Sequence, residues 1–210
     1  MRISIIGLSG TGKTYWSKRL SAEAGFDLIC CDELLRSKLA TPLIEASSTE
    51  AGELGKWLGW PYEAGYLQRQ GVLIDGETAV MKEVLWGEEI ALEERLDNIV
   101  LDTSGSVIYT GDEIMQRLKE LTVVVYFATP REALDLMFHR YISEQKPLIW
   151  GEFFHPMSDE SSECAMRRCF KELYQWREER YKSYADVVIA HAERESADFT
   201  AQQLLKKIGG

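Results

Sequence analysis

Short apolar runs rich in β-branched residues recur along the chain, and stretches with helical spacing of apolar positions separate them. The apolar runs predict strands at residues 3–6, 26–31, 99–102, 122–127 and 186–190. The spaced stretches predict helices over residues 15–24, from residue 34, over 50–60, 62–70, 78–95 and 111–120, from residue 130, and over 164–184 and 197–208. Because strands alternate with helices, the pattern predicts an α/β fold, a three-layer α/β/α arrangement around a mainly parallel sheet of about five strands.

Two segments depart from this alternation. Between the second and third predicted strands, a polar loop over residues 41–49 is followed by three predicted helices, so we expect a helical insertion over residues 41–96. Residues 145–162 carry two prolines and aromatic residues that look exposed, which favours an irregular, mobile lid over residues 144–163. The length of 210 residues fits a single domain, 1–210, that includes both segments.

The turn after the first predicted strand has the sequence Gly7-Leu8-Ser9-Gly10-Thr11-Gly12-Lys13-Thr14. Such spacing between a strand and a helix is typical of a P-loop, the Walker A motif, and the flanks argue against a glycine-rich turn with an unrelated lysine. The glycines let successive backbone amides point inward, and the helix adds its unpaired N–H groups and dipole. We expect all eight residues to bind ATP, with Lys13 at the outer phosphates and the Thr14 hydroxyl on Mg²⁺. Without ligand, Lys13 is expected to point into solvent.

Two aspartates follow predicted strands, at the edge of a parallel sheet where ligands bind. Asp102 stands where P-loop proteins place the acid that orients Mg²⁺, although it could instead cap the turn at Ser104. Asp32 could cap the next helix, or it could hold or deprotonate an acceptor hydroxyl. We expect the P-loop, Asp32, residues 102–106 and the lid to converge on one cleft, which favours the functional roles.

Composition narrows the range of partners. The net charge is −10 and no run of lysine or arginine occurs, which argues against nucleic acid and an anionic membrane surface. The apolar stretches are too short to cross a bilayer, and the first strand begins too early for a signal peptide, so we expect a cytoplasmic protein. Four cysteines without metal-site spacing fit free thiols in that compartment. The sequence does not decide between monomer and dimer.

The order of these motifs resembles the shikimate kinase family of small P-loop kinases over most of the chain. Besides the P-loop, the resemblance depends on three stretches: Leu101-Asp102-Thr103-Ser104-Gly105-Ser106 followed by Val123-Val124-Val125-Tyr126-Phe127, Lys146-Pro147-Leu148-Ile149 in place of the family's Arg-Pro-Leu-Leu lid motif, and Arg177 with Tyr181-Lys182-Ser183-Tyr184-Ala185-Asp186-Val187. The resemblance implies an ATP- and Mg²⁺-dependent kinase. It also implies that Asp32 contacts substrate hydroxyls, that Ser104, Gly105 and Ser106 lie at the substrate, and that Arg177 grips a substrate carboxylate.

Two further cations are candidates for the nucleotide. Lys146 of the lid can neutralise phosphate charge but lacks the fork of an arginine, and it could equally be a solvated surface lysine. Arg140 could stack on the adenine ring, because guanidinium planes suit aromatic faces, or it could be an ordinary helix-surface residue.

The chain also departs from the family's pattern. Cys30 stands at the first acid of the Asp-x-Asp motif, so Asp102 could supply the lost charge near the metal. Two serines replace glycines of the family's three-glycine turn and narrow the approach to it. The Phe-Arg-x-x-Glu motif is not found, and its nearest match has Leu67 at the arginine position and Arg69 as a displaced candidate. Losing one guanidinium of a two-arginine clamp costs about 2 kcal/mol or more, so a different acceptor is expected.

The sequence therefore predicts a kinase that moves the γ-phosphoryl group of Mg-ATP to a hydroxyl of a small, anionic metabolite. In this hypothesis Lys13, Asp32 and Arg177 are the catalytic residues, and Thr14 and Asp102 hold the metal. The alternatives are a nucleoside or nucleotide kinase, and a nucleotide-binding regulatory protein with little transfer activity, which Cys30 and the missing arginine would favour.

Overall fold

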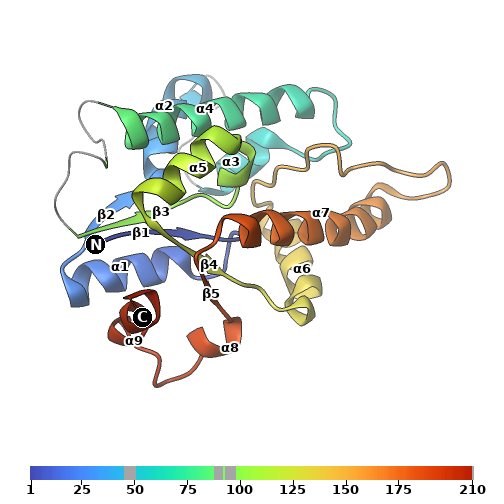
Figure 1. Ribbon diagram of the computed structural model, residues 1–210. Helices are drawn as coiled ribbons and strands as arrows, with labels where there is room; N and C mark the ends of the chain where they lie inside the picture. The colour runs from blue at the N-terminus through green and yellow to red at the C-terminus, as the bar shows by residue number, and fades with distance from the viewer. Residues whose placement is uncertain (45–50, 88–91, 93–97, 210) are drawn as a thin grey trace.

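The computed structural model describes residues 1–44, 51–87, 92 and 98–209. In these residues a sheet of five parallel strands lies between two layers of helices, which confirms the α/β prediction (Figure 1). The strands are β1 (Arg2–Ile6), β2 (Asp27–Cys30), β3 (Ile99–Asp102), β4 (Val123–Phe127) and β5 (Val187–Ile189). Their order, β2-β3-β1-β4-β5, puts β1 at the centre, so the P-loop leaves the middle of the sheet.

The helical segments follow the predicted order along the chain. They are α1 (Lys13–Ala24), α2 (Cys31–Ile44), α3 (Ala51–Leu58), α4 (Tyr66–Trp86), the 3₁₀ turn η1 (Val107–Tyr109), α5 (Asp112–Leu121), the 3₁₀ turn η2 (Arg131–Ala133), α6 (Leu134–Glu144), α7 (Ser162–Tyr184), α8 (His191–Arg194) and α9 (Ala201–Gly209). Helices α1, α8 and α9 lie on one side of the sheet, and α2, α4, α5 and α7 lie on the other (Figure 1).

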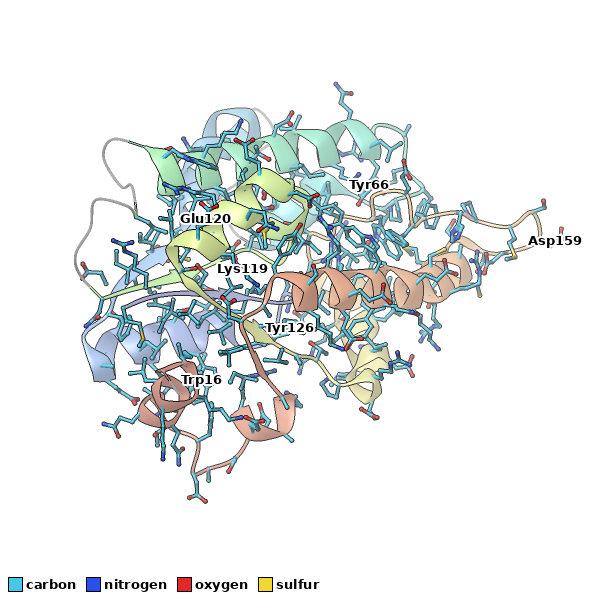
Figure 2. The ribbon with its side chains drawn as sticks, in the orientation of Figure 1. Trp16, Tyr66, Lys119, Glu120, Tyr126 and Asp159 are labelled. Atoms are coloured by element: carbon cyan, nitrogen blue, oxygen red, sulfur yellow. The ribbon has the colours of Figure 1, made fainter. Side chains whose placement is uncertain are left out.

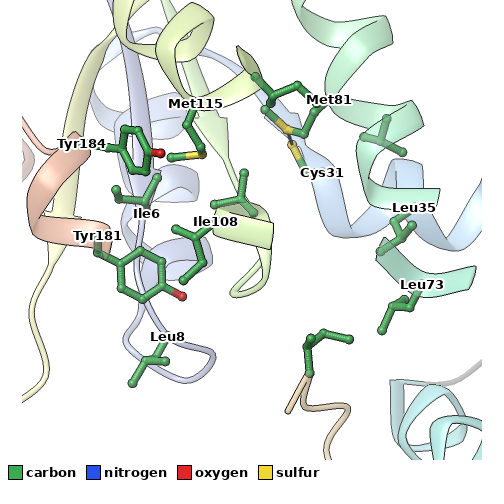
Figure 3. Close-up of a cluster of buried hydrophobic side chains, with 14 of the residues drawn as sticks. Ile6, Leu8, Cys31, Leu35, Leu73, Met81, Ile108, Met115, Tyr181 and Tyr184 are labelled. Atoms are coloured by element: carbon green, nitrogen blue, oxygen red, sulfur yellow. Dashed lines mark hydrogen bonds between the residues drawn. The ribbon is translucent and has the colours of Figure 1, made fainter. Parts of the chain in front are cut away.

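The two faces of the sheet carry separate apolar cores, because successive side chains of a strand point to opposite faces. On the α1 side, Ile3 and Ile5 of β1 pack with Trp16 and Leu20. On the other side, Ile6 packs with residues of α4, α5 and α7 in a larger cluster. Figure 2 shows Trp16 and Tyr66 on opposite sides of the sheet, and Figure 3 shows part of the larger cluster around Ile6, Met115 and Tyr181.

Several predicted boundaries beside the cleft were wrong. Residues 41–44, expected in a loop, continue α2, while residues 45–49 lie outside the described part. Cys31, expected to end the second strand, begins α2, so Asp32 lies in the first helical turn. There its negative charge interacts favourably with the positive end of the helix dipole.

Helix α4 is a single helix where the sequence predicted two. It begins at Tyr66 after a turn and runs through Gly71 and Gly76, two residues that weaken a helix. Gly76 has a packing reason, because a Cβ built there would lie 3.1 Å from Leu35 of α2. The helix ends at Trp86, short of the predicted residue 95, because Gly87 adopts an extended conformation. Residues 88–91 and 93–97 of that prediction lie outside the described residues. None of the described helices has the length and apolarity required to cross a membrane.

Candidate active site

The P-loop connects β1 to α1 and uses its glycines for backbone conformations that other residues avoid. Gly10 and Gly12 have φ values of +83° and +87°, and Gly7 has +143°. A Cβ at Gly7 would also lie 2.9 Å from the Phe127 carbonyl oxygen of β4. Gly12 occupies the N-cap of α1 and has no side chain to occupy the first-turn N–H groups. This end of the helix is therefore open to an anion.

Lys13 lies inside the loop, and the expectation that it points into solvent was wrong. Its side chain is 7 % exposed, and Nζ donates hydrogen bonds to the carbonyl oxygens of Gly7 (2.9 Å) and Leu8 (3.1 Å). Burial lowers the pKa of Lys13, while the charges of Asp102, Asp32 and Glu77 raise it, in that order. A buried ammonium is costly unless it is paired, so it needs these oxygens when no phosphate is bound.

Asp102 lies at the end of β3, next to Thr14 and Cys30. Its side chain is 2 % exposed, and burial raises its pKa, while a hydrogen bond from Thr14 and the charge of Lys13 lower it. The Cys30 Sγ lies 3.9 Å from Oδ2, and Oδ1 is buried without a hydrogen-bond partner among the described residues. A carboxylate oxygen and a hydroxyl side by side are ligands that suit Mg²⁺, so the unpartnered Oδ1 fits a metal at this place.

A cleft of about 420 Å³ opens between the P-loop, α2, the turn after β3 and residues 145–161. It brings together most of the side chains that the sequence singled out for an acceptor, including Asp32 and Arg177. Its lining is Ser9, Gly10, Asp32, Leu35, Arg36, Leu54, Leu73, Ser104, Gly105, Ser106, Glu144, Lys146, Pro147, Leu148, Ile149 and Arg177. The P-loop and the turn are in close contact, since a Cβ at Gly105 would lie 2.7 Å from the Ser9 hydroxyl and 2.9 Å from its backbone nitrogen.

Arg177 of α7 is the buried cation of this cleft. Its side chain is 3 % exposed, and its hydrogen bonds within the part of the chain that the structure describes all go to uncharged oxygens. Its guanidinium donates to the carbonyl oxygens of Ile149 (2.8 Å) and Gly105 (3.4 Å) and to the Tyr109 hydroxyl (3.3 Å). The charge is held by neutral oxygens, and it can bind an anion without breaking an ion pair.

A smaller cavity of about 80 Å³ adjoins the cleft and shares Ser9, Gly10 and Arg177 with it. Its walls include Arg140 and the apolar side chains of Met137, Phe170 and Leu173. Lys146 lines both cavities and pairs with Glu144 at 2.6 Å. The structure therefore places both predicted nucleotide cations beside the P-loop.

Glu77 of α4 is the residue that the sequence analysis missed. Its side chain is 2 % exposed, and both of its oxygens accept hydrogen bonds, Oε1 from Ser104 and Oε2 from Ser106 at 2.6 Å. Burial raises the pKa of Glu77 to about 7, while the Ser106 hydrogen bond, Arg177 and Lys13 lower it. The signal was present, because Glu77 shares a helical face with the buried Leu73 and is the one charged residue at a core position of that face.

Two other arginines differ from the prediction in their position relative to the cleft. Arg69 does not reach the cleft: its guanidinium donates to the carbonyl oxygens of Leu58 (2.9 Å) and Ala64 (3.2 Å) and lies 3.4 Å from Glu63. It holds the connection between α3 and α4, and we withdraw it as a substrate ligand. Arg36, which we had not considered, lines the cleft from α2, one helical turn beyond Asp32.

The start of the predicted lid is fixed to α4. Trp150 is fully buried, contrary to the expectation of exposed aromatic residues. Its backbone nitrogen donates to the Tyr66 hydroxyl (3.1 Å) and to Gln70 Oε1 (3.0 Å), and its indole donates to the Tyr141 hydroxyl (3.0 Å). Residues 145–161 have no helix or strand, as predicted, and their mobility stays a prediction.

The chain resembles solved structures in fold. The shikimate kinase from Aquifex aeolicus matches at 17 % identity and a TM-score of 0.58, over 100 % of this chain and 97 % of its own. The shikimate kinase from Bacteroides thetaiotaomicron matches at 18 % identity and a TM-score of 0.57, over 100 % of this chain and 94 % of its own. The shikimate kinase from Acinetobacter baumannii, in complex with shikimate, matches at 22 % identity and a TM-score of 0.52, over 99 % of this chain and 89 % of its own. The sequence matches no protein-family model and no curated protein. The fold is that of the shikimate kinases, which confirms the resemblance at the level of fold.

Proposed function

We propose that this chain is an ATP-dependent phosphotransferase of the shikimate kinase type, which moves the γ-phosphoryl group of Mg-ATP to a hydroxyl of a small, anionic metabolite. One observation carries the proposal: the P-loop residues Ser9 and Gly10 form a wall of the same cleft as Asp32 and Arg177. A phosphate held by the loop would therefore adjoin a carboxylate that can orient a hydroxyl and a cation that can bind an anion. Positioning and charge stabilisation are what phosphoryl transfer requires of a protein.

Each residue then has a defined part. The loop amides and Lys13 bind the phosphates, and Lys13 exchanges its bonds with Gly7 and Leu8 for phosphate oxygens. Thr14 and Asp102 would hold Mg²⁺, which supplies neutralisation of the phosphate charge. Asp32 orients or deprotonates the acceptor hydroxyl.

The acceptor differs from shikimate in this proposal, although a fold relative binds shikimate. Leu67, at the position of the family's second arginine, is 68 % exposed, and Arg69 is engaged elsewhere. Among the described residues that line the cleft, Arg177 carries the one buried guanidinium that can pair with a carboxylate. We therefore expect weak shikimate phosphorylation with normal ATP binding.

The test is ADP release in a coupled assay with hydroxy acids, sugars, nucleosides and shikimate, each run with the parent protein and Lys13→Met. An acceptor that raises ADP release well above the ATPase background, only in the parent, supports the proposal. A nucleoside as the best acceptor would favour a nucleoside kinase. ATP binding without any acceptor-stimulated turnover would favour a regulatory nucleotide-binding protein and contradict the proposal. Shikimate turnover of about 1–100 s⁻¹, lost in Arg177→Ala, would refute the altered acceptor.

We further propose the cytoplasm as the place of action. All four cysteines are free thiols, which supports a reducing compartment.

A further inference from the structure

The turn after β3 forms the floor of the cleft, and its two serine hydroxyls both point to one buried carboxylate. Ser104 donates to Glu77 Oε1, and Ser106 donates to Glu77 Oε2 at 2.6 Å. The Ser104 hydroxyl oxygen also accepts the backbone N–H of Ser106 at 3.1 Å. Both serines line the cleft, while Glu77 lies behind them at 2 % exposure.

A count of donors and acceptors fixes what this floor offers to a ligand. An ionised carboxylate only accepts hydrogen bonds, and each serine has a single proton to donate. With both protons donated to Glu77, the two serine hydroxyls have only lone pairs left. The Ser106 oxygen has two free lone pairs, and the Ser104 oxygen has one after the bond from the Ser106 N–H. The side chains of the floor can therefore only accept hydrogen bonds from a molecule in the cleft.

Building on the proposed phosphotransferase, we propose that Glu77 is a positioning residue that makes Ser104 and Ser106 an acceptor-only floor. The phosphoryl acceptor must then present hydroxyl or ammonium donors to this floor. Its anionic group lies towards the cations of the cleft, Arg177 and Arg36. The substrate class is a small polyol acid or amino alcohol acid, with a donor in addition to the hydroxyl that is phosphorylated. A keto or ether oxygen at the same place meets only lone pairs and is excluded.

The floor is acceptor-only while Glu77 is ionised, and the charges around Glu77 influence the pH at which it ionises. Asp32 of α2 faces it and disfavours its ionisation, while Arg177 of α7 and Lys13 of the P-loop favour it. The Cys31 thiol, also near Glu77, has a pKa well above its ordinary value because of burial and stays neutral. Burial raises the pKa of Glu77 to about 7. Below that pH, protonated Glu77 has a proton of its own to donate, which frees one serine proton to turn into the cleft. The preference for ligand donors is therefore lost as the pH falls through this range.

Neutron diffraction from the deuterated, full-length protein tests the floor without any substrate. At a pD well above the Glu77 pKa, we expect the deuterons of both serine hydroxyls on the lines to Glu77 and none on the carboxylate. A deuteron on Glu77 at that pD, or a hydroxyl deuteron that points into the cleft, overturns the proposal. This result does not depend on turnover, so it is independent of whether the protein is a kinase.

A binding experiment tests the consequence with two named probes, shikimate and its keto analogue 3-dehydroshikimate, by saturation-transfer NMR on the Mg-ADP-loaded protein. We expect shikimate to bind better than the keto analogue by about tenfold at alkaline pH, because the site's lone pairs stay unpaired against a keto oxygen. In Glu77→Gln the amide donates to one serine, whose proton then turns to the cleft, so the preference and its pH dependence disappear. Asp75→Asn, an exposed change on the same helix, is the matched control and keeps both.

The remaining outcomes contradict the proposal. Equal binding of the two probes to the parent protein, or an unchanged preference in Glu77→Gln, would each overturn it. Failure of the proposed function would give a different result: the protein would still prefer shikimate to its keto analogue in the binding experiment, but no acceptor would stimulate ADP release.

Discussion

Replacement of Asp102 by asparagine is the sharpest test of the metal site. The substitution keeps the shape of the side chain and removes its charge. In the structure Oδ1 is buried without a hydrogen-bond partner among the described residues, and Thr14 bonds to the same carboxylate. Cys30 is the neighbour closest to a replacement ligand, but burial raises the pKa of its thiol and keeps it neutral. The charge of Asp32 also acts on Asp102, but no hydrogen bond joins the two carboxylates among the described residues.

These contacts set the size of the expected effect. Loss of a carboxylate that holds or orients a metal typically lowers metal affinity by about 10- to 100-fold, and we expect Asp102→Asn to raise the Mg²⁺ concentration for half-maximal activity by that factor. Cys30→Ser removes only an S–H contact of 3.9 Å to Asp102. Weak hydrogen bonds of this kind contribute less than about 1 kcal/mol, so the change should stay under about fivefold.

The pH dependence gives a second readout with a defined sign. Because burial raises the pKa of Asp102, the protonated form that cannot bind metal appears at a higher pH than for an ordinary aspartate. The Mg²⁺ requirement of the parent should therefore increase as the pH falls towards that raised pKa, and this increase should be absent in Asp102→Asn. Loss of Asp102 also removes the largest of the charges that raise the pKa of Lys13, so this pKa should fall further in the variant. As the pH rises, Lys13 of the variant should lose its proton, and nucleotide binding should weaken, at a lower pH than in the parent.

The assay is a Mg²⁺ titration of acceptor-dependent or background ATP turnover at several pH values, with calorimetry of ADP binding at saturating and zero Mg²⁺. Equal Mg²⁺ requirements in Asp102→Asn and the parent would refute the metal role and leave Asp102 as a turn residue. A larger effect from Cys30→Ser than from Asp102→Asn would reverse the assignment.

Three further predictions concern the frame of the site. Lys13→Met should abolish phosphoryl transfer and weaken Mg-ATP binding, and it should also lower the unfolding free energy by about 1–3 kcal/mol because two loop carbonyls lose their donor, as chemical denaturation can measure. Gly105→Ala should weaken ADP binding at least about tenfold by displacing the P-loop backbone, whereas Gly71→Ala, with open space around it, should leave binding unchanged and stabilise the helix by about 0.5–1 kcal/mol. Arg69→Gln should lower stability without changing the KM of the acceptor, and a rise of that KM would restore Arg69 to the site.

The sequence was sufficient for the frame because its signals are local. Alternating strands and helices predicted the parallel sheet, and that sheet brings the P-loop, Asp32 and the turn after β3 to one edge. Each of these features follows its own strand, so no knowledge of distant contacts was needed. The same logic predicted that the P-loop, Asp32, the turn after β3 and the lid converge, and residues of all four line one cleft, although Arg69 does not reach it.

Two of the errors involve partners far apart in the chain. Glu77 and its serines are separated by 27 and 29 positions, and their contact depends on a helix register that runs through two glycines. Trp150 looked exposed because its partners on α4 lie 80 or more positions away. Arg69 was misassigned because spacing alone cannot tell whether a guanidinium turns to a ligand or to carbonyl groups of its own turn.

Lys13 of the P-loop and Arg177 of the cleft are buried cations that share a property suited to binding anionic ligands. Lys13 bonds to the carbonyl oxygens of Gly7 and Leu8, and Arg177 bonds to those of Ile149 and Gly105. A carboxylate partner would have to be displaced by an incoming phosphate, at the cost of a buried unpaired charge. Carbonyl oxygens hold the cations in place and release them at the smaller cost of neutral hydrogen bonds. Burial lowers the pKa of Lys13, and the carboxylates of the site oppose this lowering from a distance, so they favour the charged form without occupying its hydrogen-bond donors.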